Sequence, residues 1–394
     1  MSKGHVTELS GGKPLRLTWI DALRVYAALG VVLIHTTTDF AGQPFEEATP
    51  GERVGPAVLR VVGELSGSEL FFLFSLFLLA WKLDRRDMSW STSALDQAKR
   101  LLIPFLAWTV FYAFFRLCKA TEFNYSAAIL AELSQVKSWV QYLVLGSAQY
   151  QLHFLPEFFL ISLFVPLIRS GARYPLAGFF LVPALFVMND VQGWLWGNIQ
   201  DPNLRDYLLR AVKILCYTGY GLAAFALFGV WKRQLDKPAS EAIARLAILS
   251  SIILFTGTLT YAGMLVAKGN WGIRPPTAFY AHFLMPVAVF SIFLGLQYWP
   301  WSPMYSRLAR FSFGLYLVHP IFIDAIDIAL HRSGLALDPT VMVVGKFTVA
   351  ATLSFAFSVL IGRFAATAWL IGLGPVPLVT RFSERGAIGK GGGA

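Results

Sequence analysis

Three ionisable residues, Asp21, Arg24 and His35, lie within one apolar stretch of the chain, from Leu17 to Phe40. A charged side chain near the centre of a bilayer costs roughly 2.5–3.5 kcal/mol on insertion scales, so such residues are rare in spans unless they are used or neutralised. At 100° per residue, the three fall within a sector of about 60° on one helical face. A histidine can act as a general base near neutral pH, and an arginine can bind phosphate or carboxylate groups. The stripe therefore indicates proton transfer or anion binding inside a membrane.

Each residue of this stripe also has a structural interpretation. The segment Thr18–Asp21 fits a capping box, in which the Asp21 carboxylate accepts hydrogen bonds from free N–H groups at the helix start. Arg24 could snorkel to the membrane surface or pair with Asp21. His35 could be a neutral imidazole bonded to a carbonyl at the helix end. Eleven residues of helix separate Arg24 from His35, which is about 16.5 Å along the axis, so the two are expected near opposite faces of the membrane.

The composition predicts an integral membrane protein. Of 394 residues, 56% are hydrophobic and 14% are charged, against about 25% charged in an average soluble domain. The net charge of +10 comes without a basic run interleaved with aromatics, so nucleic acid is not expected as a partner. Cys118 and Cys216 both lie in apolar stretches and cannot form a disulfide framework or a metal motif.

The apolar blocks predict an all-α polytopic membrane protein with about ten transmembrane helices. The expected spans are Trp19–Thr38, Gly55–Trp81, Leu101–Leu117, Leu152–Ile168, Leu176–Met188, Leu209–Trp231, Ile243–Ala267, Thr277–Leu296, Phe311–Leu330 and Val341–Ile371. We expect residues 1–16 to be a cytoplasmic segment, 17–373 one transmembrane domain and 374–394 a flexible cytoplasmic tail. Most Lys and Arg between spans fall on the side of the N-terminus, so the positive-inside rule predicts cytoplasmic termini in a multi-pass cell-membrane protein.

Two acidic or basic residues stand out in the second and third spans. Glu69 lies in the otherwise apolar run around "LFFLFSLFLL", where it could pair with Arg24 or Arg100 or bind a substrate. Arg100 lies at the start of the third span, where it could anchor the helix by the positive-inside rule or contact donor phosphates.

Two further pairs share helical faces in later spans. His153 and Glu157 are four residues apart, so they could form an acid/base or sugar-binding pair, or a structural hydrogen bond. Tyr316 and His319 lie beside Pro320, which interrupts helical hydrogen bonding and could free backbone groups to line a cavity. Other charged residues within spans are expected to form interior ion pairs or interface anchors. They are Lys213, Asp324, Asp327, Lys346 and Arg363.

Four blocks of the sequence resemble motifs of the acyltransferase-3 family of integral membrane acyltransferases. They are the Arg-x10-His pattern of Arg24 and His35, "GSELFFLFSLFLL" at 67–79, "AKRLLIPFLAW" at 98–108 and "FSFGLYLVHP" at 311–320. The chain departs from the family at Glu69, where Asp is usual, and at Gln151 and His153, where His and Trp are usual. The blocks follow the family's order, and the resemblance covers residues from about 15 to 373.

The resemblance implies an O-acyltransferase that moves an acyl group, most often acetyl from acetyl-CoA, to a hydroxyl of an envelope or exported carbohydrate. His35 is then the expected general base, with Arg24 beside the donor, and Glu69, Arg100, His153, Glu157, Tyr316 and His319 are candidates for substrate binding. A base with a pKa near 7 would accelerate attack by a sugar hydroxyl by roughly 10²–10⁴-fold. An acyl-histidine intermediate is an alternative. Acyl-CoA enters as a donor substrate, and no permanently bound cofactor or metal is expected.

Two other classes of protein fit the same polar stripe. A glycan transporter or flippase would use the stripe as a polar path without covalent chemistry. A non-catalytic scaffold is disfavoured, because it would have no use for Arg24 and His35 on one face. Mass spectrometry of surface glycans discriminates between an enzyme and a transporter.

Overall fold

The computed structural model describes residues 17–86 and 88–375. These residues form helices and contain no strand, so the expected all-α polytopic fold is confirmed. Nine helices of the described part are long and apolar enough to cross a membrane, and a tenth span results if the bent helix pair Phe154–Leu163 and Val165–Arg173 counts as one. The expected N-terminal segment 1–16 and nearly all of the tail 374–394 lie outside the described residues.

The helices follow one another with short connections. In chain order they are α1 (Thr18–Thr36), α2 (Pro50–Glu64), α3 (Ser68–Arg85), α4 (Trp90–Glu122), α5 (Ser126–Leu133), α6 (Val136–Leu145), α7 (Phe154–Leu163), α8 (Val165–Ile168), α9 (Ser170–Arg173), η1 (Pro175–Phe180), α10 (Leu181–Asn198), α11 (Pro202–Lys232), α12 (Lys237–Lys268), α13 (Pro276–Gly295), α14 (Pro303–Ala309), α15 (Ser312–Ser333), α16 (Pro339–Arg363), α17 (Ala365–Ala368) and η2 (Trp369–Ile371).

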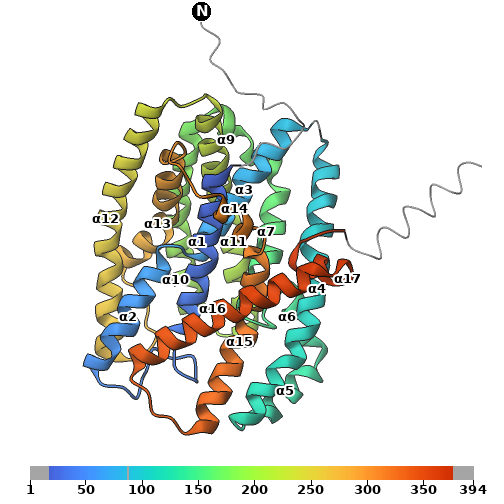
Figure 1. Ribbon diagram of the computed structural model, residues 1–394, viewed down its shortest axis with the longest axis vertical. Coiled ribbons are helices and arrows are strands. Elements are labelled where there is room, and N and C mark those ends of the chain that lie inside the picture. Colours follow the sequence, from blue (N-terminus) through green and yellow to red (C-terminus); the bar gives the residue numbers. More distant parts are fainter. Residues whose placement is uncertain (1–16, 87, 376–394) are drawn as a thin grey trace, which may run out of the picture.

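Helix α1 runs through the middle of the bundle and contacts α2, α3, α13, α14, α15 and α16 (Figure 1). Helices α12 and α13 pack along one side, and α4, with α5 and α6, lies on the opposite side (Figure 1). We name the two ends of the bundle after α1: the Thr18 end, where α1 begins, and the Thr36 end, where it ends. The positive-inside prediction makes the Thr18 end cytoplasmic.

Burial separates a central layer of helices from a peripheral one. In the most apolar windows of Pro50–Arg85 and of α11, 72% of residues are buried, whereas the corresponding figure is 17% for α12 and 22% for α16. Apolar side chains on the peripheral helices therefore face outward, as expected for surfaces in contact with lipid. Polar side chains that line the bundle interior lie on the central helices.

Side chains cap the starts of several long helices at both ends of the bundle. Thr49 and Glu52 form a complete capping box at α2. Asp201, Asp236 and Asp338 each accept backbone N–H groups at the starts of α11, α12 and α16 and are followed within two residues by a proline. This arrangement satisfies orphan donors and fixes φ for the first turn.

Helix α1 departs from this pattern and corrects one expectation. Its N-cap is Leu17, and no side chain caps it, so the capping role expected for Asp21 is wrong. The Asp21 carboxylate instead accepts a hydrogen bond from Ser306 of α14 at 2.6 Å and lies 3.6 Å from the Arg24 guanidinium. Asp21 therefore ties the start of α1 to α14 and neutralises part of the charge of Arg24.

Three expected spans have different limits in the structure. The span expected at Gly55–Trp81 is two helices, because α2 ends at Glu64 and α3 begins at Ser68 after Gly67, whose φ of 18° lies outside the helical region. The span expected at Leu152–Ile168 bends by 63° between α7 and α8. The last span ends at Arg363 and is followed by two short turns, α17 and η2. Apolar composition predicted these segments but could not show where the backbone breaks.

Candidate active site

His35, at the last turn of α1, lies in a cluster of three rings from three different elements. Its ring centroid is 4.1 Å from that of Tyr150, in the loop before α7, and 5.4 Å from that of His319 on α15, with which it is stacked. The structure thus brings together two residues that the sequence singles out separately, His35 as a candidate base and His319 as a candidate for substrate binding. Two imidazoles in contact provide two nitrogen bases at one point in the bundle.

Pro320 explains how the His319 ring is oriented. Proline has no N–H, so Pro320 cannot donate to the carbonyl of Tyr316, four residues earlier. The His319 Nδ1 lies 2.8 Å from that carbonyl oxygen. Because a carbonyl only accepts, Nδ1 carries the hydrogen and Nε2 has the lone pair. Nε2 is buried and has no hydrogen-bond partner within the described part of the chain. The helix itself is not interrupted, since it continues through Pro320 to Ser333, but the backbone group that Pro320 was expected to free is the carbonyl of Tyr316, which contacts His319.

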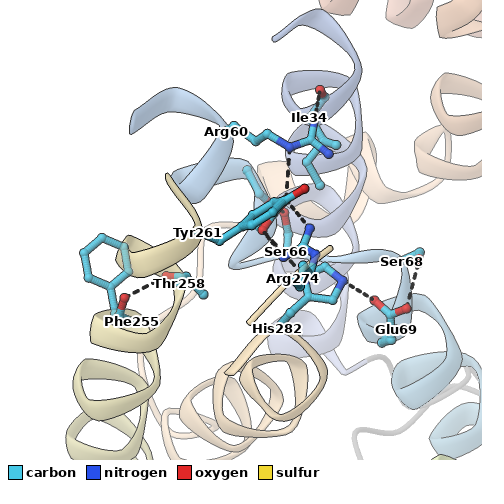
Figure 2. Close-up of polar contacts among 12 residues, drawn as sticks. Ile34, Arg60, Ser66, Ser68, Glu69, Phe255, Thr258, Tyr261, Arg274 and His282 are labelled. Atoms are coloured by element: carbon cyan, nitrogen blue, oxygen red, sulfur yellow. Dashed lines mark hydrogen bonds and ion pairs between the residues drawn. The ribbon is translucent and has the colours of Figure 1, made fainter. Parts of the chain in front are cut away.

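Arg60 of α2 holds the backbone next to His35. Its Nη1 donates to the carbonyl of Ile34 and to the hydroxyl of Thr37, each at 3.3 Å, and Figure 2 shows the contact with Ile34. The carbonyl of Ile34 also accepts from the backbone N–H and the hydroxyl of Thr37, so the guanidinium adds a charged donor to the last helical turn. Arg60 thus fixes the position of the turn that carries His35.

A buried carboxylate fixes Arg60 in turn. The Glu64 carboxylate accepts from Arg60 Nε at 3.0 Å and from both terminal nitrogens of Arg274 at 2.7 and 3.0 Å. Burial opposes the charge of Arg274, but the neighbouring Glu64 carboxylate outweighs it and raises the pKa of Arg274 above its ordinary value. The bidentate pair links α2 to the connection between α12 and α13, and such pairs restrict geometry strongly.

Close backbone packing adds to this fixation of α1. A Cβ on Gly30 would lie 1.4 Å from the Ser66 hydroxyl, and a Cβ on Gly63 would lie 2.9 Å from the Ile34 side chain. The absence of side chains at these two glycines allows α1 to touch the segment between α2 and α3. The break after α2 therefore contributes to the site by bringing Ser66 and Arg60 against α1.

Glu69 lies deeper in the bundle and has partners other than those expected. Its carboxylate accepts from Tyr217 of α11 at 2.5 Å and from Ser68 at 3.1 Å. His282 of α13 lies between two carboxylates, with Nδ1 3.6 Å from Glu64 and Nε2 3.9 Å from Glu69 (Figure 2). The polar partners of Glu69 are thus Tyr217, Ser68 and His282, and not the arginines Arg24 and Arg100 that were expected as ion-pair partners.

Sequence reasoning missed Arg60, Glu64, Arg274 and His282. Two signals were present: Arg60 and Glu64 are four residues apart, the spacing of a helical ion pair, and His282 is an ionisable residue in an apolar span, the criterion that identified His35. Arg274 lies in a connection, where positive charges are common, and its role depends on tertiary contact alone.

A cavity of about 580 Å³ opens at the Thr18 end and is lined by four cationic side chains. They belong to Arg24, Lys82, Arg100 and Arg310. Lys82 is paired with Asp96 of α4, and within the described residues no carboxylate pairs with Arg100 or Arg310. The apolar part of the lining includes Phe74, Leu78 and Phe158. Cations beside apolar walls suit a ligand that carries both phosphates and an apolar chain.

Aromatic rings separate this cavity from the histidine pair. Phe71 and Phe154 line the cavity, and their ring centroids lie 5.1 and 5.8 Å from that of Tyr316. The Tyr316 centroid is in turn 6.3 Å from that of His319. The Tyr316 hydroxyl donates to the backbone carbonyl of Gln151. Tyr316 is therefore the buried side chain that lies between the cavity-lining phenylalanines and His319.

His153 and Glu157 do not form the pair expected from their spacing. The Glu157 carboxylate pairs with Arg210 and, at 3.2 Å, with Lys213, both on α11. The His153 Nδ1 faces the carbonyl of Tyr150. Burial and then the positive charges of Lys213 and Arg210 lower the pKa of His153 well below its ordinary value, so its ring is neutral at pH 7.

A second group of buried charges holds the chain directly after α1. Asp327 of α15 pairs with Lys119 at 2.6 Å and with Lys346 at 2.8 Å, and Asp324 pairs with Lys119 at 3.2 Å. Lys346 also donates to the carbonyl of Thr38 at 3.0 Å. The expected interior ion pairs of Asp324, Asp327, Lys346 and, above, Lys213 are confirmed. Arg363 is exposed at the end of α16, in agreement with an interface anchor.

Among the described residues, no group of three or more His, Cys, Asp or Glu side chains is placed to hold a metal ion. The chemistry of the site rests on imidazole, guanidinium, ammonium and carboxylate groups. Such a set can bind anions, orient hydroxyls and transfer protons.

A family model described as an acyltransferase domain, Acyl_transf_3, matches residues 17–363. This range covers α1 to α16 and includes the cationic side chains of the cavity at the Thr18 end and the pair of His35 and His319. Neither the curated proteins nor the solved structures contain a match to the chain.

Proposed function

The chain belongs to the acyltransferase-3 family and is a membrane acyltransferase, and from that premise we propose that it transfers an acyl group, acetyl in the first instance, from acyl-CoA to a hydroxyl of a cell-envelope or exported carbohydrate. The donor occupies the cationic cavity at the Thr18 end, and His35 is the general base. The observation that carries the proposal is the arrangement of that cavity and the His35–His319 pair on the two sides of Tyr316.

The donor fits the Thr18-end cavity by charge and by shape. Phosphates of coenzyme A would accept charge-assisted hydrogen bonds from Arg100 and Arg310, whose guanidinium groups lack a carboxylate partner in the described structure. The pantetheine arm is long and mostly neutral, and the apolar walls of the cavity lead toward Phe71 and Phe154. The thioester at its end would then lie against Tyr316.

The proposed reaction balances without an additional reactant. His35 removes the proton of the acceptor hydroxyl while the hydroxyl oxygen forms the ester bond to the carbonyl carbon of the thioester. The carbon–sulfur bond breaks, and the thiolate leaves with the electron pair and accepts the proton as free coenzyme A. The ring of His319 is stacked with that of His35, and its Nε2 is a buried nitrogen with a lone pair and no partner among the described residues. His319 is thus a second base that relays the proton from the acceptor hydroxyl to the leaving thiolate.

The proposal requires Tyr316, Phe71 or Phe154 to move, because their rings fill the space between cavity and histidines. These rings are buried, and substrate-induced rearrangements of enzymes occur on the microsecond-to-millisecond timescale, within one typical turnover. Donor binding against these rings supplies a reason for the movement.

The experiment that tests the function uses labelled acetyl-CoA and glycans from cells that make the protein and from cells that lack it. We expect glycans whose mass is increased by whole acetyl groups only in the first cells, with equal amounts of glycan exported from both. Equal glycan masses with reduced export would support the flippase instead. In a second experiment, the purified protein is incubated with labelled acetyl-CoA in the absence of acceptor and is then denatured. Label that stays on the protein would indicate an acyl-histidine intermediate instead of general-base catalysis.

A further inference from the structure

A second cavity, of about 440 Å³, lies between α10, α11 and the connection from the end of α6 to the start of α7, on the His35 side of the bundle. It is distinct from the cationic cavity, with which it shares no lining residue. Its polar lining consists of Ser147, His153, Gln192, Asp206, Arg210 and Lys213. Its volume is within the range of small-molecule sites, which is about 300–1,000 Å³.

The inner end of this cavity is rich in hydrogen-bond donors. Arg210 and Lys213 share the single carboxylate of Glu157, whose side chain is only 2% exposed and lies behind the cavity wall. A guanidinium and an ammonium group have more N–H donors than one carboxylate can accept. The described structure gives these two side chains no other hydrogen-bond acceptor, and the Lys213 ammonium also lies 5.0 Å from the centre of the Tyr217 ring. Both side chains line the cavity and keep N–H donors for a ligand.

The rim of the cavity has the opposite character. Asp206 is exposed and makes no hydrogen bond within the described residues, and Gln192 and Ser147 can both donate and accept. With Glu157 and Asp206 offsetting Arg210 and Lys213, the formal charges around the cavity cancel. A ligand is thus favoured that donates and accepts hydrogen bonds around one ring, and a phosphate or other pure acceptor is disfavoured by Asp206.

One tyrosine joins this cavity to the candidate base. His153 lines the cavity and its Nδ1 faces the carbonyl of Tyr150. The ring of the same Tyr150 lies against the ring of His35. A ligand in the cavity is therefore separated from His35 by the short segment from Tyr150 to His153.

We propose that this cavity binds the sugar ring of the acceptor, with ring and hydroxyl oxygens accepting from Arg210 and Lys213 and one hydroxyl donating to Asp206. A second hydroxyl of the same sugar then faces the segment from Tyr150 to His153, on whose other side the ring of Tyr150 packs against that of His35. This inference rests on the proposed function for the reaction but concerns binding, which can be measured without any donor.

The test uses site-directed labelling of the intact chain in detergent or nanodiscs. Cys118 is exposed and Cys216 is buried, so Cys118→Ser removes the accessible thiol. Ser147→Cys in this background places a thiol in the cavity, and Ser134→Cys, exposed in the connection after α5, is the matched control. Maleimide labelling rates are measured with methyl glucoside, galactoside, mannoside and N-acetylglucosaminide, each alone.

We expect at least one glycoside to slow labelling at position 147 several-fold and to leave position 134 unchanged. Asp206→Asn, which removes a charged acceptor from the rim without breaking a hydrogen bond, should raise the half-protecting concentration about tenfold. Equal labelling at position 147 with and without every glycoside overturns the inference. Protection at position 147 without acetyl transfer in the glycan assay would overturn the proposed reaction and leave the sugar site standing.

Discussion

The two cavities differ in how their positive charges are balanced. At the Thr18 end, Arg100 and Arg310 line the wall without a carboxylate partner among the described residues, and phenylalanine rings form the remainder. In the cavity beside His153, Arg210 and Lys213 share Glu157, and Asp206 adds a second negative charge. A surplus of cations suits a polyanion, whereas balanced charges suit a neutral ligand with many hydroxyls.

The same comparison extends to rigidity. Around His35, Arg60 binds the carbonyl of Ile34 and Lys346 binds that of Thr38, so the backbone is held on both sides of the proposed base. At the Thr18 end, the Arg24 guanidinium lies 3.6 Å from the Asp21 carboxylate and Lys82 is paired with Asp96, so these cations are held by side chains of other residues rather than by backbone. A fixed base and an adjustable anion site are what an enzyme with one reacting hydroxyl and a long, flexible donor requires.

The largest predicted effect is at His35. His35→Ala should lower acyl transfer by roughly 10²–10⁴-fold, because the hydroxyl loses its base, while binding of acetyl-CoA stays unchanged. The measurement is transfer of labelled acetyl together with donor binding. His331→Ala is the matched control, since His331 is exposed at the same end and pairs with Glu122. If the His35→Ala protein transferred acetyl at the wild-type rate, His35 would not be the general base, and the proposed division of roles between the two regions would be contradicted.

The next effect concerns the cationic cavity alone. Arg100→Gln combined with Arg310→Gln should raise KM for acetyl-CoA by about tenfold or more, because two charge-assisted hydrogen bonds to donor phosphates are lost. KM for the acceptor should not change. Arg169→Gln, exposed at the same end and outside the cavity lining, controls for the change in net charge. A shift in acceptor KM instead would mean that the ligands of the two cavities have been assigned the wrong way round.

A smaller effect probes how tightly α1 is held. Gly30→Ala places a methyl group where the Ser66 hydroxyl lies, and overpacking of this kind costs about 1–3 kcal/mol. Thermal unfolding in detergent should show a lower Tm than wild type. Gly193→Ala on α10, where a Cβ meets nothing within 4 Å, should have little effect. Equal Tm values for the two variants would contradict close packing at the Thr36 end.

The smallest predicted effect is a pH dependence at His153. Its pKa is lowered well below 6.5 by burial and by the cations Lys213 and Arg210, so below about pH 6.5 the unfolded chain binds a proton that the folded chain refuses. Stability therefore falls as pH decreases through this range. His153→Gln should flatten the decrease in Tm between pH 7 and pH 5. An unchanged slope would show that His153 is protonated in the folded protein.

Composition and motif were sufficient for the fold and for part of the site. Long apolar runs predicted the all-α membrane bundle because a bilayer permits few other structures, and the spacing of Arg24 and His35 correctly indicated two distant parts of one interior stripe. His319 was also singled out, and it stacks on His35.

The partners of individual charges could not be predicted in the same way. The four-residue spacing predicts that His153 pairs with Glu157, and the apolar surroundings of Glu69 predict an arginine partner. Glu157 is instead paired with Arg210 and Lys213, whereas Glu69 accepts a hydrogen bond from Tyr217 and has His282 nearby. Helical periodicity reports which residues share a face, whereas the partner of a buried charge is decided by which other helix packs there. The same limit explains why Asp21 was interpreted as a cap before Ser306 was known to face it.

The central claim is that the donor is held at the Thr18 end and the hydroxyl is activated by His35 at the other end. The most direct test reconstitutes the protein in one orientation in liposomes, with acetyl-CoA on one side of the membrane and the carbohydrate acceptor on the other. We predict acetylated carbohydrate only when the Thr18 end faces acetyl-CoA. Transfer only when both substrates are on the same side of the membrane would contradict the account.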